Sequence, residues 1–135
     1  MPHTDVFFYG LFMDEDLLRA KGLQPEGSRL AYLEGFALRI GQRAAVVPVA
    51  GARVYGVLFS LTPAELDRLY SEPSVQAYKP QHVVARLEDE SPVPALCYNL
   101  PEPPLPGERN PEYAAKLRVV AQKVGLPAEY VASLQ

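Results

Sequence analysis

The amino-acid sequence predicts the α+β class, as a small mixed, mainly antiparallel β-sheet or barrel with peripheral helices. Three observations lead to this prediction. Strand-like segments outnumber helical ones, and the connections between the middle segments are short. Short connections exclude the crossover helices that parallel strands need. The segment 53–61 carries apolar residues on both faces, as does a strand that is covered on both sides.

The length of 135 residues fits one domain. We expect residues 1–135 to form a single unit, with a core over 5–100 and a C-terminal helical extension over 110–134. The first strand-like segment, Asp5–Gly10, is aromatic and β-branched and ends at a glycine. A helix is predicted over Asp14–Lys21, because the three acidic residues at its start suit the positive end of the helix dipole.

The middle of the chain reads as a series of strands. We predict one strand over Ser28–Gly41 with a bend at Gly35, and a short apolar strand over Ala44–Val49. A turn at Gly51 is expected to separate that short strand from the clearest strand of the chain, Arg53–Leu61.

A strong helix start follows this strand. Thr62 can cap the helix, Pro63 fits the first helical position, and Glu65 completes a capping box. Pro73 is expected to end the helix, because the residue before a proline is disfavoured in the α region.

The second half begins with two predicted paired strands, Tyr78–Glu88 and Val93–Leu100. A rigid, extended loop over Pro101–Arg109 leads to the last long helix, which Asn110 caps and Gly125 ends. A short final helix follows it. The apolar positions of the long helix recur at helical spacing and are Tyr113, Leu117, Val120 and Val124.

Composition excludes several classes of function. The net charge is −3 and no segment is densely basic, which argues against nucleic-acid binding. No run approaches the roughly 20 apolar residues that span a bilayer, and the first residues lack a signal-peptide pattern. The single cysteine, Cys97, can form neither an internal disulfide nor a metal site with four thiolate ligands. We therefore expect a cytoplasmic protein without cofactor or metal; nothing in the sequence predicts an oligomeric state.

Two segments are candidates for a functional site. In the first, the exposed amides of Leu11 and Phe12 follow a strand that ends in Tyr9-Gly10. They can hold an anion, or they can form an ordinary strand-to-helix turn. In the second, Glu72 lies beside a predicted helix end. Its carboxylate can act as a general acid or base if it is screened from water, or it can be a surface residue of a turn.

Four arginines lie within 25 residues on consecutive predicted strands. If two of them converge they can bind a carboxylate, and otherwise they cover a solvated face. They are Arg29, Arg39, Arg43 and Arg53.

Taken together, these segments resemble the γ-glutamylcyclotransferase-like family. The shared motifs, over residues 5 to about 100, are Phe8-Tyr9-Gly10-Leu11, Val54-Tyr55-Gly56-Val57-Leu58-Phe59, Glu65-Leu66-Asp67, Tyr78 to Leu87 and Ala95 to Tyr98. The resemblance implies the cyclisation of a γ-glutamyl amine or peptide to 5-oxoproline and a free amine. It also implies a γ-glutamyl-binding pocket, for which we predict the lining residues Tyr9, Gly10, Leu11, Phe12, Tyr70, Tyr78 and Tyr98.

The sequence departs from the family pattern at two positions. Leu11 stands where a small polar residue is usual, and Tyr70 stands where the family's acid/base glutamate is expected. Glu72, the nearest carboxylate, is two positions later, which is about 200° around a helix. It can take the catalytic role only if the helix ends early and the chain turns back towards the pocket.

Three functions therefore stay open. The first is a cyclotransferase that uses Glu72 as acid/base. The second is an inactive binding module for a small carboxylate or amino-acid-like ligand on the same fold. The third is a scaffold that offers the proline-rich loop Pro101–Gly107 to a partner.

Overall fold

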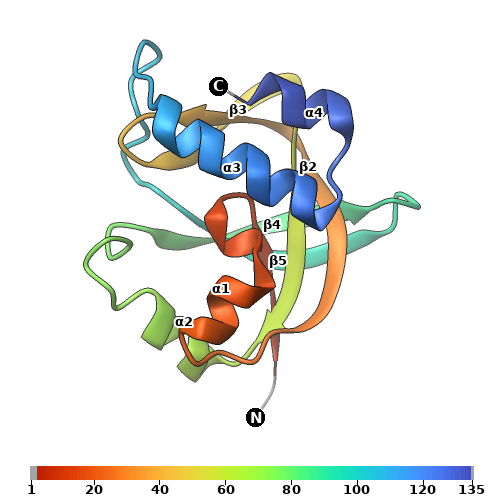
Figure 1. The fold of residues 1–135 in the computed structure, drawn as a ribbon. Coiled ribbons are helices and arrows are strands. Elements are labelled where there is room, and N and C mark those ends of the chain that lie inside the picture. The colour runs from red at the N-terminus through yellow and green to blue at the C-terminus, as the bar shows by residue number, and fades with distance from the viewer. Residues whose placement is uncertain (1–2, 135) are drawn as a thin grey trace.

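The computed structural model describes residues 3–134 and confirms the predicted fold class (Figure 1). Its strands close into a barrel in which every neighbouring pair is antiparallel except β1 and β5, which run parallel. In their order around the barrel the strands are β1 (Thr4–Phe8), β3 (Ala44–Leu61), β2 (Glu26–Ile40), β4 (Lys79–Leu87) and β5 (Pro92–Asn99).

The strands β2 and β3 form one long hairpin, in which Tyr32 pairs with Tyr55 and Ile40 with Ala44. The prediction of two strands separated by a turn at Gly51 is wrong, because β3 continues through this residue. Gly51 has a φ of 81° and Gly35 in β2 has a φ of 83°. A glycine accepts this left-handed conformation without strain, so each strand bends and still continues.

The helical segments are short and lie outside the barrel. They are the 3-10 turn η1 (Leu11–Met13), α1 (Glu15–Ala20), α2 (Pro63–Leu69), α3 (Pro111–Val124) and α4 (Ala128–Ser133). The turn η1 was not predicted, and α2 ends at Leu69, before the expected stop at Pro73. Figure 1 shows α3 and α4 together over one side of the barrel, and α3 contacts η1.

The buried side chains form one continuous hydrophobic cluster that includes the barrel interior and the inner face of α3. Val6 and Phe7 of β1 are both buried, although successive strand residues point to opposite faces. This strand is therefore covered on both sides, by the barrel interior and by the helices. Within residues 3–134, no helix is long and apolar enough to cross a membrane.

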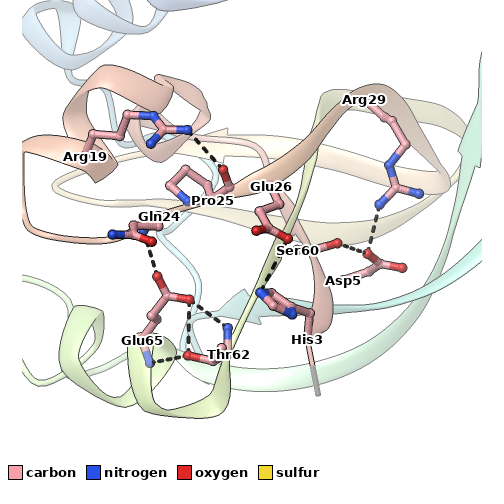
Figure 2. Close-up of polar contacts among 10 residues, drawn as sticks. All are labelled: His3, Asp5, Arg19, Gln24, Pro25, Glu26, Arg29, Ser60, Thr62 and Glu65. Carbon is pink, nitrogen blue, oxygen red and sulfur yellow. Dashed lines mark hydrogen bonds and ion pairs between the residues drawn. The ribbon is translucent and has the colours of Figure 1, made fainter. Parts of the chain in front are cut away.

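Polar contacts fix the point where α2 leaves the barrel (Figure 2). The Thr62 hydroxyl accepts a hydrogen bond from the Glu65 amide at 3.2 Å. The Glu65 carboxylate accepts hydrogen bonds from the backbone amide of Thr62 at 2.9 Å and from the backbone amide of Gln24 at 2.7 Å. Burial raises the pKa of Glu65, but these hydrogen bonds outweigh it and leave the pKa below its usual value. The predicted capping box is thus present, and it holds the helix that carries Tyr70 at its C-terminal end.

Candidate functional site

A cavity of about 450 Å³ opens where β1 runs into η1, between that turn and the segment that follows α2. All seven residues predicted from the sequence to line a pocket lie around it, namely Tyr9, Gly10, Leu11, Phe12, Tyr70, Tyr78 and Tyr98. Lys21, Arg43 and Tyr113 also line it. The structure thus gathers residues from β1, η1, β5 and α3 at one place.

The wall of the cavity is aromatic. The Tyr70 ring stacks on the Tyr98 ring, with centroids 3.8 Å apart and planes 7° from parallel. The Phe12 ring meets Tyr70 edge-on, with centroids 6.2 Å apart. Burial raises the pKa of Tyr70 well above its usual value. The phenol is therefore neutral at physiological pH and cannot serve as a general base there.

Two tyrosine hydroxyls of the cavity are committed to backbone carbonyls. The Tyr9 hydroxyl donates to the carbonyl oxygen of Tyr98 at 2.9 Å, and the Tyr78 hydroxyl donates to that of Ala44 at 2.5 Å. Burial is the main cause that raises the pKa of both phenols. The first hydrogen bond ties the end of β1 to β5, and the second ties the segment after α2 to β3. Both connect walls of the cavity.

Glu72 is not among the residues that line the cavity. Both of its carboxylate oxygens accept hydrogen bonds from Lys21 Nζ, at 2.5 and 2.8 Å, and a third of each side chain is exposed. Because α2 ends at Leu69, the chain does turn early, but it turns towards the end of α1. Among residues 3–134, no Asp or Glu side chain lines the cavity. A catalytic role for Glu72 therefore stays a prediction, at a position outside the lining.

The turn after β1 is covered by Tyr113, which the sequence predicted only as part of the apolar face of a helix. A Cβ added at Gly10 would lie 2.7 Å from the Tyr113 hydroxyl oxygen, so this position needs glycine for close approach rather than for an unusual φ. Burial raises the pKa of Tyr113 to about 12, and the nearby Leu11 amide acts in the opposite direction. The Tyr113 hydroxyl therefore lies beside one of the two amides that can hold an anion.

The four arginines do not converge. Arg29 pairs with Asp5, Arg53 pairs with Glu34, and Arg39 donates to the carbonyl oxygen of Pro104. Arg43 lines the cavity. Within the described part of the chain, its guanidinium makes neither an ion pair nor a side-chain hydrogen bond. The Lys21 charge is compensated by Glu72, so Arg43 supplies the uncompensated positive charge of the cavity.

Cys97 and His82, whose side-chain types can carry chemistry, do not line this cavity. Burial raises the pKa of the Cys97 thiol to about 12, so the thiolate is rare at neutral pH. His82 is exposed on β4. Over residues 3–134, no three His, Cys, Asp or Glu side chains come together to hold a metal ion.

Comparison with known proteins gives a family match over most of the chain. Residues 6–116 match the family model described as gamma-glutamyl cyclotransferase, AIG2-like. No curated protein matches the sequence.

Solved structures share the fold at low sequence identity. A human protein described as uncharacterized is 19% identical, with 99% of this chain and 87% of that chain covered at a TM-score of 0.80. A structure described as gamma-glutamyl cyclotransferase is 20% identical, with 98% and 86% covered at 0.79. YkqA from Bacillus subtilis is 22% identical, with 98% and 52% covered at 0.78. These likenesses bear on the fold alone.

Proposed function

Because the chain belongs to the gamma-glutamyl cyclotransferase, AIG2-like family, we propose that it binds a small carboxylate ligand in the cavity beside η1 and does not cyclise it. The observation that carries this proposal is Tyr70. This residue stands where the family resemblance calls for the acid/base glutamate, and its neutral phenol is part of the aromatic wall.

The reaction of the family needs a group that accepts a proton from the attacking amine and returns it to the leaving amine. Within residues 3–134, the cavity lining contains no carboxylate. The buried phenol of Tyr70 has a raised pKa, so it cannot accept that proton near neutral pH. A bound γ-glutamyl compound would then be positioned but not activated.

Retained binding is supported by the charges of the lining. Arg43 and Lys21 are its only charged residues among those that the structure describes, and both are positive. In a partly enclosed aromatic cavity, a charge-assisted hydrogen bond to a carboxylate is stronger than in open water. A small acid is therefore the ligand class that we propose.

A second candidate is the cyclising reaction with Glu72 as acid/base. One observation favours it: Lys21 lines the cavity, and its ammonium lies 2.5 Å from the Glu72 carboxylate. If this partly exposed ion pair opens, the Glu72 carboxylate is separated from the cavity only by the Lys21 side chain.

One pair of measurements separates the two functions. Thermal shift with glutamate, 5-oxoproline and γ-glutamyl amines reports binding, and the release of 5-oxoproline reports turnover. We expect stabilisation by at least one of these acids and no release of 5-oxoproline.

Release by the wild type that is lost in Glu72→Gln and kept in Glu88→Gln would establish the second candidate instead. Glu88 is a suitable control because it is exposed and makes no ion pair within the described residues. The absence of binding by any acid, those of this panel and 3-phenylpropionate included, would overturn both functions.

A further inference from the structure

We propose that Arg43 binds the acid group of the ligand, and that the ligand is a carboxylic acid with an aromatic body and no amino group beside the acid. This inference rests on the proposed function, because it assumes that the cavity binds a carboxylate. It differs from the possibility raised by the sequence, in which the backbone amides of Leu11 and Phe12 hold an anion.

Arg43 is the cation of the cavity that is available to a ligand. Of the two cationic side chains in the lining, Lys21 is already paired with Glu72 at 2.5 Å. Arg43 has no ion-pair partner within residues 3–134. It is half-buried, and its charge is felt at the cavity wall, where it opposes the rise that burial causes in the pKa of Tyr78. A guanidinium binds a carboxylate through two parallel hydrogen bonds, which an ammonium cannot do.

The Tyr113 hydroxyl covers the turn after β1, because a Cβ added at Gly10 would lie 2.7 Å from its oxygen, and the Leu11 amide lies beside it. An acid group that used this amide would have to move the packed Tyr113 side chain aside. Moving a packed side chain is costly. Arg43 offers the acid group a partner without that displacement.

An ammonium beside the acid would enter a cavity whose lining, among the described residues, carries Arg43 and Lys21 but no carboxylate. The Glu72 carboxylate is paired with Lys21 and is not part of that lining. Desolvation of an ammonium without a carboxylate partner is unfavourable, and the unpaired Arg43 charge adds repulsion. The cavity is therefore expected to select against α-amino acids.

Phe12, Tyr70 and Tyr98 give the cavity an aromatic surface on which the body of a ligand can pack, and two of the rings are already held in a parallel stack. A planar apolar group buries its area against such rings and gains edge or face contacts beyond that burial. A volume of about 450 Å³ accommodates one small molecule of this kind.

A matched pair of probes tests the proposal. 3-Phenylpropionate and phenylalanine differ only in the α-ammonium group, and isothermal titration calorimetry measures both on the whole chain. We expect 3-phenylpropionate to bind at least about tenfold more tightly than phenylalanine. Arg43→Gln should weaken the binding of 3-phenylpropionate at least about tenfold, and Arg43→Lys should restore part of it.

Arg39→Gln is the control, because Arg39 lies outside this cavity and donates to the carbonyl oxygen of Pro104. A thermal melt of each variant shows whether it is folded. If 3-phenylpropionate binds wild type and Arg43→Gln equally, or if phenylalanine binds as tightly, the inference is wrong while carboxylate binding stands. If neither of these probes nor any acid of the thermal-shift panel binds the wild type, the proposed function itself fails.

Discussion

At the scale of single residues, the proposal of binding without catalysis depends on Tyr70. Its ring stacks on Tyr98 and meets Phe12 edge-on, so a neutral aromatic group fills the place of the expected carboxylate. Such a substitution keeps the wall of the cavity and removes the group that moves the proton. The same residue therefore accounts for a retained fold and for the proposed loss of the reaction.

The substitution Tyr70→Glu should confer release of 5-oxoproline from γ-glutamyl amines, because it places a carboxylate at the cavity wall. Burial would raise the pKa of that carboxyl group and bring it nearer to neutrality, as general acid–base catalysis requires. The measurement is the rate of 5-oxoproline formation.

Tyr70→Gln is the matched control, since glutamine is similar in size to glutamate and has no ionisable group. Equal and undetectable release by both variants in folded protein would contradict this assignment of the position. Each variant should lose about 2–4 kcal/mol of stability, since the aromatic stack is lost.

Gly10 and Tyr113 should be coupled energetically. In Gly10→Ala the new Cβ would meet the Tyr113 hydroxyl oxygen at 2.7 Å, which is closer than such contacts normally come. We expect a loss of about 1–3 kcal/mol in the free energy of unfolding. Tyr113→Phe removes the oxygen, so Gly10→Ala should cost less in that background. Equal costs in the two backgrounds, measured by urea unfolding, would show that the hydroxyl does not lie on the turn.

At the scale of elements, α2 depends on its N-terminal cap. Thr62→Ala removes the hydroxyl that accepts the Glu65 amide and should lower the free energy of unfolding by about 1 kcal/mol. Urea unfolding measures the loss, and Thr4→Ala offers a threonine control outside a helix cap. An unchanged midpoint for Thr62→Ala would mean that the cap does not support the fold.

The same cap gives a pH dependence in acid. The pKa of Glu65 lies below its unfolded value, because the hydrogen bonds from Thr62 and Gln24 outweigh the opposing effect of burial. A lowered pKa contributes stability that is present above the unfolded pKa and is lost as pH falls through the folded one. The Thr62 hydroxyl also donates to the Glu65 carboxylate at 3.1 Å. Because Thr62→Ala removes this hydrogen bond to the charged group, it should cost less at a pH below the ordinary glutamate range than at pH 7. A cost that is independent of pH would contradict the role of the Glu65 charge.

How well the sequence predicted each element depends on whether the cause is local. The capping box of α2 is local, and its residues predicted the start of the helix correctly. Gly51 was predicted to form a turn, but β3 continues through this residue. That continuation depends on the pairing of β3 with β2, which is a long-range contact. The α2 helix ended early for a similar reason, since Tyr70 packs against rings from η1 and β5.

The candidate site follows the same division. The family resemblance predicted the seven lining residues, because the short motifs that contain them can each be read from the sequence. Tyr113 was missed as a site residue, since its spacing with Leu117 is that of an ordinary apolar helix face. Only the packing of α3 against η1 brings its hydroxyl to Gly10. Arg43 was one of four similar arginines, and tertiary structure alone distinguishes it.

At the scale of the whole molecule, buried phenols make stability sensitive to alkali. Burial raises the pKa of Tyr9, Tyr70, Tyr78, Tyr113 and Tyr130, with that of Tyr113 at about 12. An unfolded tyrosine loses its proton near pH 10. Above that pH the unfolded state binds fewer protons than the native state, so the free energy of unfolding falls with rising pH.

We therefore expect constant stability from neutral pH to about pH 9 and a steep fall from about pH 10 to pH 12. Urea unfolding at each pH measures the fall, and absorbance of the phenolate follows the titration of the phenols. Normal titration of all the phenols in native protein near pH 10 would contradict their burial.

The central claim is that the cavity binds a carboxylate without turning it over. A time course of proton NMR spectra tests this most directly, because one sample of protein with 3-phenylpropionate and a γ-glutamyl amine reports both events. We predict that the resonances of 3-phenylpropionate broaden on addition of protein and that no 5-oxoproline resonances appear. Growth of 5-oxoproline resonances with wild-type protein, and their absence with Glu72→Gln, would contradict the claim.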